Sequence, residues 1–571
     1  MAPTEHRLDV ADEPGDAPGS SVVATPVRLK AWLRPVGLFI LAMISLVGYL
    51  VIRPLSIDGL RHPAGVATVE LGLALPYALA CWWVMVGAPP HTRRIYWSEW
   101  TVVIGAALAF FAIVFPLWPS LSGDPYRYVW DARVLAHGYN PLAIAPESPV
   151  LASLRDTLIY PRIHWVHVPT IYPPGAQGLY LLAYLIAPDN VWAIKAEMAL
   201  GVALVAALLI GYLRMRGQDP LRVIVWLWCP LVVVELGMDG HVDAAAIAAW
   251  LAALLLTERT KQRWTRGAIG VLLGIATLIK LYPALLLLAL GRKDDRWLYI
   301  AFLATVALGY LPFLDGGVPT LGFLGIYVGD VQSYGALLFW LRNACASLGA
   351  PLVAAPITAL LVAVVVAGTV AWGRYQGRLS EGVALYILLA LWLTLTPHLL
   401  PWYVTALVPF CALYLRPPWQ SRGSALTGAL WLGVCIMPAF NIAFDPAFRD
   451  LEWLYAAIYI AVVLSAATGL LLHRRFRRHS KHSRRAAAWL RGCVVSESSS
   501  PRTSLPRQTQ YDHQLRSTHL VSAYQDLTET LLTCTELKGM RNGFCPNGIA
   551  NHASNAPPAS RTLHREHDAL Q

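Results

Sequence analysis

The chain has 571 residues, of which 56% are hydrophobic and only 14% are charged. Soluble domains carry about 25% charged residues, so this chain has too few polar groups to cover a water-exposed surface. The composition excludes an ordinary soluble enzyme, and equally a disordered, fibrous or disulfide-stapled protein. The 22 Trp residues fit a protein of the lipid bilayer, because indole rings anchor at membrane interfaces.

The formal net charge of +11 is concentrated in short loops and in the stretch after residue 472. That distribution is typical of the cytoplasmic side of a membrane protein, so no nucleic-acid partner is expected. Eight Cys residues are present, but none forms a C-x-x-C pair. The cysteines therefore predict neither a metal site nor a redox motif.

The first part of the chain predicts a polar leader followed by three membrane spans. Residues 1–34 are expected to form a disordered cytoplasmic leader, because they begin with a run rich in Pro, Gly and Asp. A helix rises 1.5 Å per residue, so about 20 apolar residues cross the hydrocarbon core. Segments at about 35–52, 67–86 and 100–118 meet this requirement.

Residues 119–175 form the longest polar interruption before the C-terminal tail. They contain many Pro, Asp, Arg, Tyr and His residues and no spanning segment. Loops of this length are usually functional or disordered, and the many Tyr and Trp residues argue against disorder. The apolar segment that follows, 176–187, is short, which predicts an interfacial or re-entrant helix.

Later apolar segments raise the expected total to about 14 transmembrane or partly spanning helices, an all-α polytopic fold. Lys280 and Pro283 interrupt two of these segments, and broken helices at membrane depth persist only where they line protein or a water-filled cavity. The later segments lie at about 190–213, 222–237, 241–257, 265–279, 281–291, 297–314, 351–372, 383–397, 401–416, 424–443 and 453–472.

Basic residues in the loops predict the orientation of these helices. With the N-terminus in the cytoplasm, most Arg and Lys clusters also fall there, as the positive-inside rule requires, with Arg53 and Arg61 as the main exceptions. Loop 119–175 is then extracytoplasmic, and the membrane domain covers residues 35–472. Residues 473–571 form a cytoplasmic tail, first basic and attracted to anionic lipid, then disordered.

Two carboxylates in the long loop are candidates for catalysis. Asp124 and Asp131 flank Arg127 in a segment rich in aromatic residues. One interpretation is an ordered outer loop stabilised by an Asp–Arg pair. The other is a catalytic carboxylate at the mouth of a lipid-facing cavity, and the residues alone leave both open.

A second group of ionisable residues lies where two apolar segments meet on the outer side: Glu235, Asp239, His241 and Asp243. Ionisable residues near bilayer depth are costly and usually functional. The group is either an ordinary loop with a satisfied His or a site for acceptor or sugar hydroxyls.

The third candidate is a lone cation with a nearby aromatic rim. Lys280 either extends its amine to the membrane interface or neutralises a phosphate where water is scarce. His398, Trp402 and Tyr403 fall on the same outer rim. Their rings either stack on a sugar or belong to the interfacial aromatic belt.

The long loop resembles the first catalytic loop of the GT-C superfamily of integral membrane glycosyltransferases. It is most similar to bacterial mannosyltransferases that use polyprenyl-phosphate sugars, in which an acidic residue and a Tyr/Arg-rich run precede an Asp, G-x-N-P-[YL] and P-T-x-Y-P-P. Later GHVDA, KLYP and PHLLPWYV segments extend the resemblance over roughly residues 100–472. Here the loop follows the third span, so two extra helices precede the usual core. The loop positions that match are Asp124, Tyr126, Arg127, Tyr128, Asp131, Gly138, Asn140, Pro141, Pro169, Thr170, Tyr172, Pro173 and Pro174.

The resemblance implies transfer of a hexose from a polyprenyl-phosphate donor to a hydroxyl of a glycan or lipid acceptor. Mannose is the leading candidate for the hexose. Asp124 would be the general base of an inverting displacement. Asp131 would orient Arg127 or Arg133, or help hold a divalent cation, although no metal ligands are assigned. The enzyme would be a multi-pass protein of the cytoplasmic (inner) membrane with an extracytoplasmic site. The substrate-binding residues would be Tyr126, Arg127, Asn140, Thr170, Tyr172, Asp239, His241, Asp243, Lys280, His398, Trp402 and Tyr403.

Two other functions remain open. Broken helices and intramembrane charges also occur in secondary transporters of sugars or organic ions, but these commonly show repeated halves, and none is visible here. A lipid-bound scaffold without activity would leave the Asp124 region free to vary without consequence.

Overall fold

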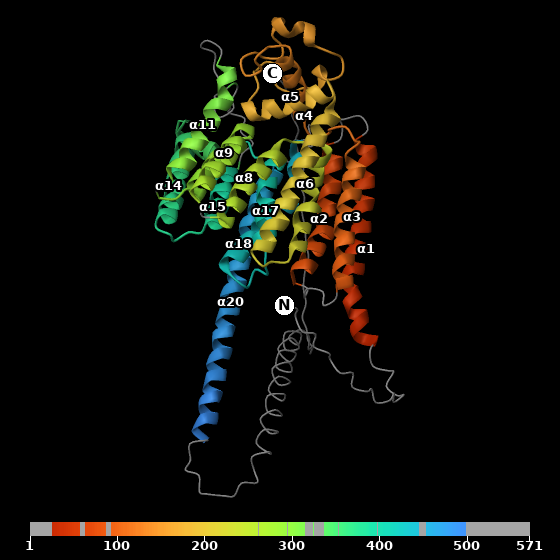
Figure 1. The fold of residues 1–571 in the computed structure, drawn as a ribbon. Helices are drawn as coiled ribbons and strands as arrows, with labels where there is room; N and C mark the ends of the chain where they lie inside the picture. Colours follow the sequence, from red (N-terminus) through yellow and green to blue (C-terminus); the bar gives the residue numbers. More distant parts are fainter. Residues whose placement is uncertain are drawn as a thin grey trace, which may run out of the picture. The chain divides into compact units, whose positions relative to one another are not determined.

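The computed structural model describes residues 25–56, 63–86, 93–260, 262–293, 295–314, 322, 324, 336–351, 353–396, 398–444 and 453–497. Every regular element in these ranges is a helix, which confirms the predicted all-α fold (Figure 1). Short 3₁₀ or π segments carry the label η.

Seven helices in the described residues are long and apolar enough to cross a membrane. A bent pair of helices, Pro220–Leu227 and Val232–Met238, meets at 65° and forms either a broken eighth span or a re-entrant loop. The prediction of about 14 helices also counted shorter apolar segments as partial spans. The seven long helices are α1 (Thr25–Leu55), α2 (Pro63–Val86), α3 (Arg93–Val114), α6 (Val191–Met215), α11 (Arg296–Tyr310, continued by η6, Leu311–Phe313), α14 (Ala354–Tyr375) and α20 (Trp453–Glu497).

The shorter elements fill the bundle between these spans. Segment 281–291, predicted to cross the membrane, forms only η5 and α10, because Lys280 is extended and Pro283 supplies no backbone N–H. The shorter elements are η3 (Pro220–Val223), α7 (Ile224–Leu227), η4 (Val232–Met238), α8 (Asp243–Arg259), α9 (Arg263–Ile279), η5 (Tyr282–Leu286), α10 (Leu287–Leu290), α13 (Ala336–Ser347), α15 (Glu381–Leu395), α16 (Pro401–Val404), η7 (Thr405–Leu407), α17 (Val408–Tyr414), α18 (Arg422–Ile436) and α19 (Ala439–Phe444).

Two segments expected to be disordered are partly helical. Residues 25–34, assigned to the leader, are the first turns of α1, whose Pro26 lies where a helix needs no backbone N–H donor. α20 continues to Glu497, because the Arg, Ala and Leu residues of 484–490 are strong helix formers. The remaining residues of these two predictions, 1–24 and 498–571, lie outside the described part of the chain.

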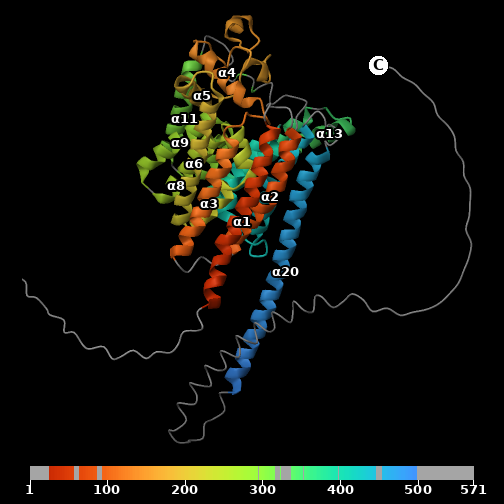
Figure 2. The same cartoon turned by 90° about the vertical axis from the view of Figure 1, so that its right-hand side faces the viewer.

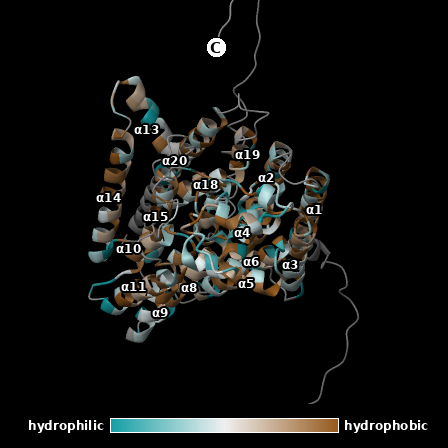
Figure 3. Ribbon diagram, turned by 90° about the horizontal axis from the view of Figure 1, so that it is seen from above, coloured by the Kyte–Doolittle hydropathy of each residue, from teal (hydrophilic) through white to brown (hydrophobic). Residues whose placement is uncertain are grey.

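The outer helices expose apolar side chains on a scale that only lipid would cover. Leu360, Val365 and Val463 are more than 60% exposed, and the helices at the periphery are largely apolar (Figure 3). Inside the bundle, Trp226 and Trp228 are buried with their indole N–H groups bound to backbone carbonyls. The chain is therefore a multi-pass membrane protein with a packed interior.

Residues 119–173, called the cap below, fold over one end of the bundle, and the N-terminal end of α1 lies at the other end (Figures 1 and 2). The cap contains α4 (Asp124–Ala136), η1 (Pro149–Leu154) and η2 (Tyr160–Arg162), and it leads into α5 (Pro174–Ile186). α5 occupies the segment predicted as an interfacial helix. Most side chains of α4 are buried against a second core rich in Tyr and Trp, so the cap is an ordered platform.

Candidate active site

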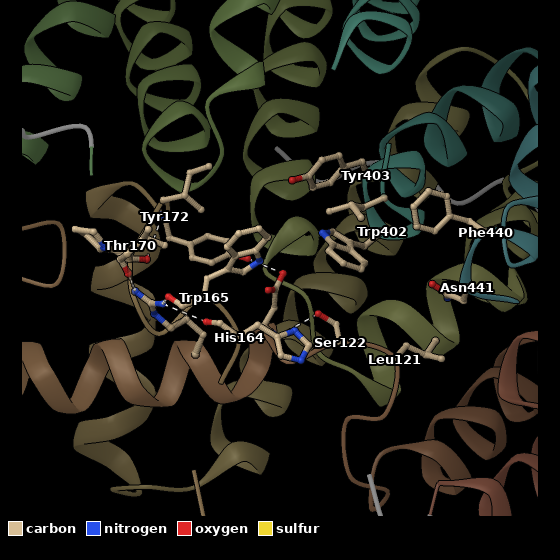
Figure 4. Close-up of a pocket in the computed structure, with 16 residues that line it drawn as sticks. Leu121, Ser122, His164, Trp165, Thr170, Tyr172, Trp402, Tyr403, Phe440 and Asn441 are labelled. Atoms are coloured by element: carbon tan, nitrogen blue, oxygen red, sulfur yellow. Dashed lines mark hydrogen bonds between the residues drawn. The ribbon is translucent and has the colours of Figure 1, made fainter. Parts of the chain in front are cut away.

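A cavity of about 160 Å³ lies between the cap and the bundle end. We call it the Asp124 cavity. Cap residues such as Trp165 and Thr170 line one side, and Trp402, Phe440 and Asn441 line the other (Figure 4). Of the predicted site residues, the cavity brings together Asp124, Arg127, Thr170, Tyr172, Trp402 and Tyr403.

Asp124 is the first residue of α4 and turns its carboxylate toward this cavity. Its side chain is 24% exposed, and its Oδ2 accepts a hydrogen bond of 2.7 Å from the hydroxyl of Tyr172. The Nδ1 atom of His241 lies 3.8 Å from the same oxygen. A helix N-terminus favours negative charge, so this position suits an ionised and accessible carboxylate.

Buried groups hold the segment that leads into α4. Asp239 accepts the backbone N–H groups of Ser120 and Leu121, both at 3.0 Å. Lys195 donates to the carbonyl oxygens of Phe115 and Leu117 at 2.6 and 2.5 Å. Asp239, predicted to bind substrate, is fully buried and lies outside the Asp124 cavity. Its observed contacts position the backbone before Asp124.

Gly123 shows how tightly this entry to α4 is packed. A Cβ atom at this position would lie 2.9 Å from the carbonyl oxygen of Arg162 and from the ring of His164. The structure thus shows a close approach of two cap segments at this glycine that excludes a side chain.

Asp131 lies behind the cavity. It is 1% exposed and pairs with Nε of Arg127 at 2.8 Å, while Gln177 donates to its other oxygen. Arg127 also donates to the carbonyl oxygens of Trp165 and Val168, each at 3.1 Å. Of the roles expected for Asp131, the geometry matches the orientation of Arg127, which ties α4 to the cavity wall.

Trp165 adds local strain to this wall. It has a φ of +58° although it is not a glycine, and its ring lines the Asp124 cavity. Large residues rarely adopt this conformation, which usually persists only where surrounding contacts enforce it, often at functional sites. Here the bond from Arg127 to the Trp165 carbonyl supplies such a contact.

Lys280 follows the end of α9, where the chain becomes extended. Its Nζ atom lies 3.2 Å from Oδ2 of Asp243, and it faces the rings of Tyr403 at 4.8 Å and Tyr172 at 5.4 Å. Lys280 is also part of the wall of a second cavity of about 320 Å³, called the Lys280 cavity. Leu285, Leu391, Trp392 and Leu395 make much of that wall apolar.

The two cavities are neighbours because Tyr172 and Tyr403 line both. His241 stacks on the cavity-lining Trp402, with ring centroids 3.8 Å apart, and so supports this part of the cavity wall. The pair of cavities offers a carboxylate in one, a cation at the junction and an apolar groove beyond it. This arrangement fits a ligand with a polar head, an anionic link and a hydrocarbon tail.

Three other predicted binding residues have structural contacts and line neither cavity. The buried hydroxyl of Tyr126 donates to the Pro119 carbonyl at 3.1 Å. Asn140 accepts the backbone N–H of Leu142 and donates to the Phe313 carbonyl, which links the cap to the end of α11. His398 is buried.

Sequence reasoning missed some of the cavity wall. His164 and Trp165 stand in the same polar loop as Asp124 and could have been named from its aromatic content. Asn441 lies in an apolar segment, where a lone amide is the only signal.

Beneath the Asp124 cavity lies a group with the spacing of a metal site. Glu235, Asp239 and His241 each place one potential ligand atom within 4.8 Å of the others. Carboxylate oxygen and imidazole nitrogen are both ordinary metal ligands. No metal ligands are predicted at these positions from the sequence.

Charge pairs outside the membrane spans also fix the cap. Arg133 donates to Asp156 and to Asp189, each at 2.7 Å. Burial raises the pKa of the Asp156 carboxyl, but the Arg133 hydrogen bond, the backbone N–H groups of Tyr160 and Ile159, and the charge of Arg133 outweigh it and lower the pKa below its usual value.

We expect Asp156→Asn to lower the stability of the cap at neutral pH by roughly 1 kcal/mol, a value reduced by solvent screening. Since the folded pKa is lowered, the contribution is present above the unfolded pKa of about 3.9 and is lost as the pH falls through the folded value. Melting temperatures of the purified variant and wild type, compared at neutral and at strongly acidic pH, measure this. A difference in melting temperature between variant and wild type that is equally large at both pH values would contradict a stabilising role for the Asp156 charge.

Residues 170–397 match the family model described as Glycosyltransferase family 87. This region of the chain resembles a GT-C-type membrane glycosyltransferase. The match confirms the predicted resemblance and supports glycosyltransferase activity over transport. It includes Tyr172, His241, Asp243 and Lys280 and begins after Asp124. No curated protein and no solved structure matches the chain.

Proposed function

We propose that this protein moves a hexose from a polyprenyl-phosphate donor to an acceptor hydroxyl, with mannose as the leading candidate for the hexose. The observation that carries the proposal is the junction of the two cavities, where a partly exposed Asp124 carboxylate faces one and Lys280 lines the other. A sugar would occupy the Asp124 cavity, its phosphate would lie near Lys280 and its prenyl chain would enter the apolar groove.

In the proposed reaction, Asp124 removes the proton from the acceptor hydroxyl as its oxygen attacks the anomeric carbon. The bond from that carbon to the phosphate oxygen breaks, and the lipid phosphate leaves with the electron pair. A single carboxylate is enough, because the phosphate is already a stable anion, and one displacement inverts the configuration. Lys280 offsets the phosphate charge, and the hydroxyl of Tyr172 holds the carboxylate in place.

The test is sugar transfer by the purified protein. A radiolabelled polyprenyl-phosphate hexose is incubated with the protein and a membrane extract that supplies acceptors, and label in glycan or lipid products is measured. In parallel, proteoliposomes are assayed for uptake of free sugars and organic ions. Transfer without uptake is expected, whereas uptake without transfer would replace the proposal with the transporter function.

We also propose that the cap is extracytoplasmic and that both termini lie in the cytoplasm of the inner membrane. The alternation of basic loops supports this orientation. Single cysteines placed at the exposed residues Val150, in the cap, and Gln376, between α14 and α15, test it in a background without the native cysteines. In intact cells an impermeant thiol reagent should label position 150 only. Labelling of position 376 only would reverse the orientation.

A further inference from the structure

The metal-like group beneath Asp124 sits at a sharp turn. The carboxylate of Glu235 lies beside His241. Asp239 and His241 flank Gly240, whose φ is +80°. A Cβ atom at Gly240 would lie 2.9 Å from Cγ of Lys195, so a glycine is required there. All three potential ligands are fully buried.

Two atoms of this group face each other without hydrogen bonds. Nε2 of His241 and Oε2 of Glu235 are 3.4 Å apart, and neither atom has a hydrogen-bond partner. Two ligands held about 2.1 Å from one cation at a tetrahedral angle are about 3.4 Å apart. The observed separation matches that of two ligands of one ion.

Neighbouring groups already orient these ligands. The other oxygen of Glu235 accepts a hydrogen bond from Asn441 at 3.3 Å. Nδ1 of His241 is in hydrogen-bond contact with the Tyr128 hydroxyl at 3.5 Å and lies 3.8 Å from Oδ2 of Asp124. Histidines that bind metal through one nitrogen commonly turn the other N–H toward a carboxylate, which fixes the ring and its tautomer.

The third ligand remains able to bind. Each oxygen of Asp239 accepts a backbone N–H, but a carboxylate oxygen has a second lone pair for a cation. Asp239 and His241 would then be held by one ion, on either side of Gly240.

The local charge independently favours a cation. Glu70 on α2 is fully buried, and neither of its oxygens has a hydrogen-bond partner. Buried carboxylates without sufficient compensation are costly, and a divalent cation removes that cost.

We infer that Glu235, Asp239 and His241 bind a divalent transition-metal cation such as Zn²⁺ or Mn²⁺. A nitrogen ligand argues against Mg²⁺, which prefers oxygen. The ion would be a positioning element, because it holds the His241 ring behind Asp124 and fixes Asp239, which in turn fixes the backbone before α4. Its binding does not depend on the proposed sugar transfer.

The test measures metal content by mass spectrometry on full-length protein in detergent. Protein is stripped with a chelator, reloaded with Zn²⁺ or Mn²⁺ and freed of excess ion by gel filtration. Wild type should retain a single equivalent, whereas Glu235→Gln and His241→Gln should bind at least tenfold more weakly. His398→Gln, which changes a buried histidine outside the group, should bind as wild type does. Wild type without retained metal, or ligand variants with unchanged affinity, would overturn the inference.

A second measurement remains decisive if the variants do not fold. Wild-type protein reloaded with Co²⁺ should show the visible absorption of an ion bound by nitrogen and oxygen ligands. The spectrum of the hydrated ion would overturn the inference. Both measurements are made without donor or acceptor. Metal binding can therefore fail while sugar transfer is observed, or hold while sugar transfer is absent, and the two proposals are tested separately.

Discussion

Asp124→Asn is expected to lower the turnover of sugar transfer by about 10²–10⁴-fold, the usual contribution of general-base assistance. The amide is nearly the size of the carboxylate and can still accept the hydrogen bond from Tyr172, so the cap should keep its structure. It cannot take up the acceptor proton. Steady-state transfer rates at saturating donor measure this loss, and gel filtration together with the melting temperature verifies folding.

Asp131→Asn is the matched control, because it makes the same chemical change seven residues along the same helix. Its carboxylate is buried against Arg127, so the variant should lose thermal stability and retain more turnover than Asp124→Asn. If Asp131→Asn loses transfer while Asp124→Asn keeps near wild-type rates, then the general base is Asp131 and the assignment to Asp124 is wrong. Two fully active variants would end the proposed mechanism.

Lys280→Met is expected to raise the donor concentration needed for half-maximal transfer by roughly tenfold to a hundredfold. The variant loses a charge-assisted contact to the donor phosphate, worth about 1.5–3 kcal/mol. Lys280→Arg keeps a charge at this position and should retain part of the donor affinity. Initial rates over a range of donor concentrations give these values.

The structure adds a complication, because Lys280 also pairs with buried Asp243. Removal of the lysine alone leaves an unpaired buried carboxylate, which is itself destabilising. The double variant Lys280→Met with Asp243→Asn removes both charges, so it should regain stability without regaining donor affinity. If donor saturation is unchanged in both variants, Lys280 does not bind the donor phosphate and only extends its amine to the membrane interface.

The membrane class, the helical fold and the order of the long polar loop could be predicted from the sequence, because they depend on composition and on the length of apolar runs. The candidate base could be named because Asp124 opens a polar loop directly after a span. The match of residues 170–397 to a family of glycosyltransferases then supports glycosyltransferase activity.

The direction in which polar side chains face could not be predicted. Tyr126, Asn140 and Asp239 belong to motifs that look like binding sites, yet they bond to backbone groups and stabilise the cap. Spacing along the chain cannot separate a carboxylate that caps backbone N–H groups from one that faces a cavity. Asn441 reaches the cavity through the packing of segments more than 300 residues from Asp124, which leaves no local pattern.

The shared wall of Tyr172 and Tyr403 has a consequence for how selectivity can change. If the proposed donor lies across both cavities, its sugar would be recognised by the cap and its prenyl chain by η5 and the end of α15. In that arrangement, substitutions at Leu285 or Leu391 would alter the preferred chain length, and substitutions at Thr170 would alter the preferred sugar. Each preference can drift during evolution without disturbing the other.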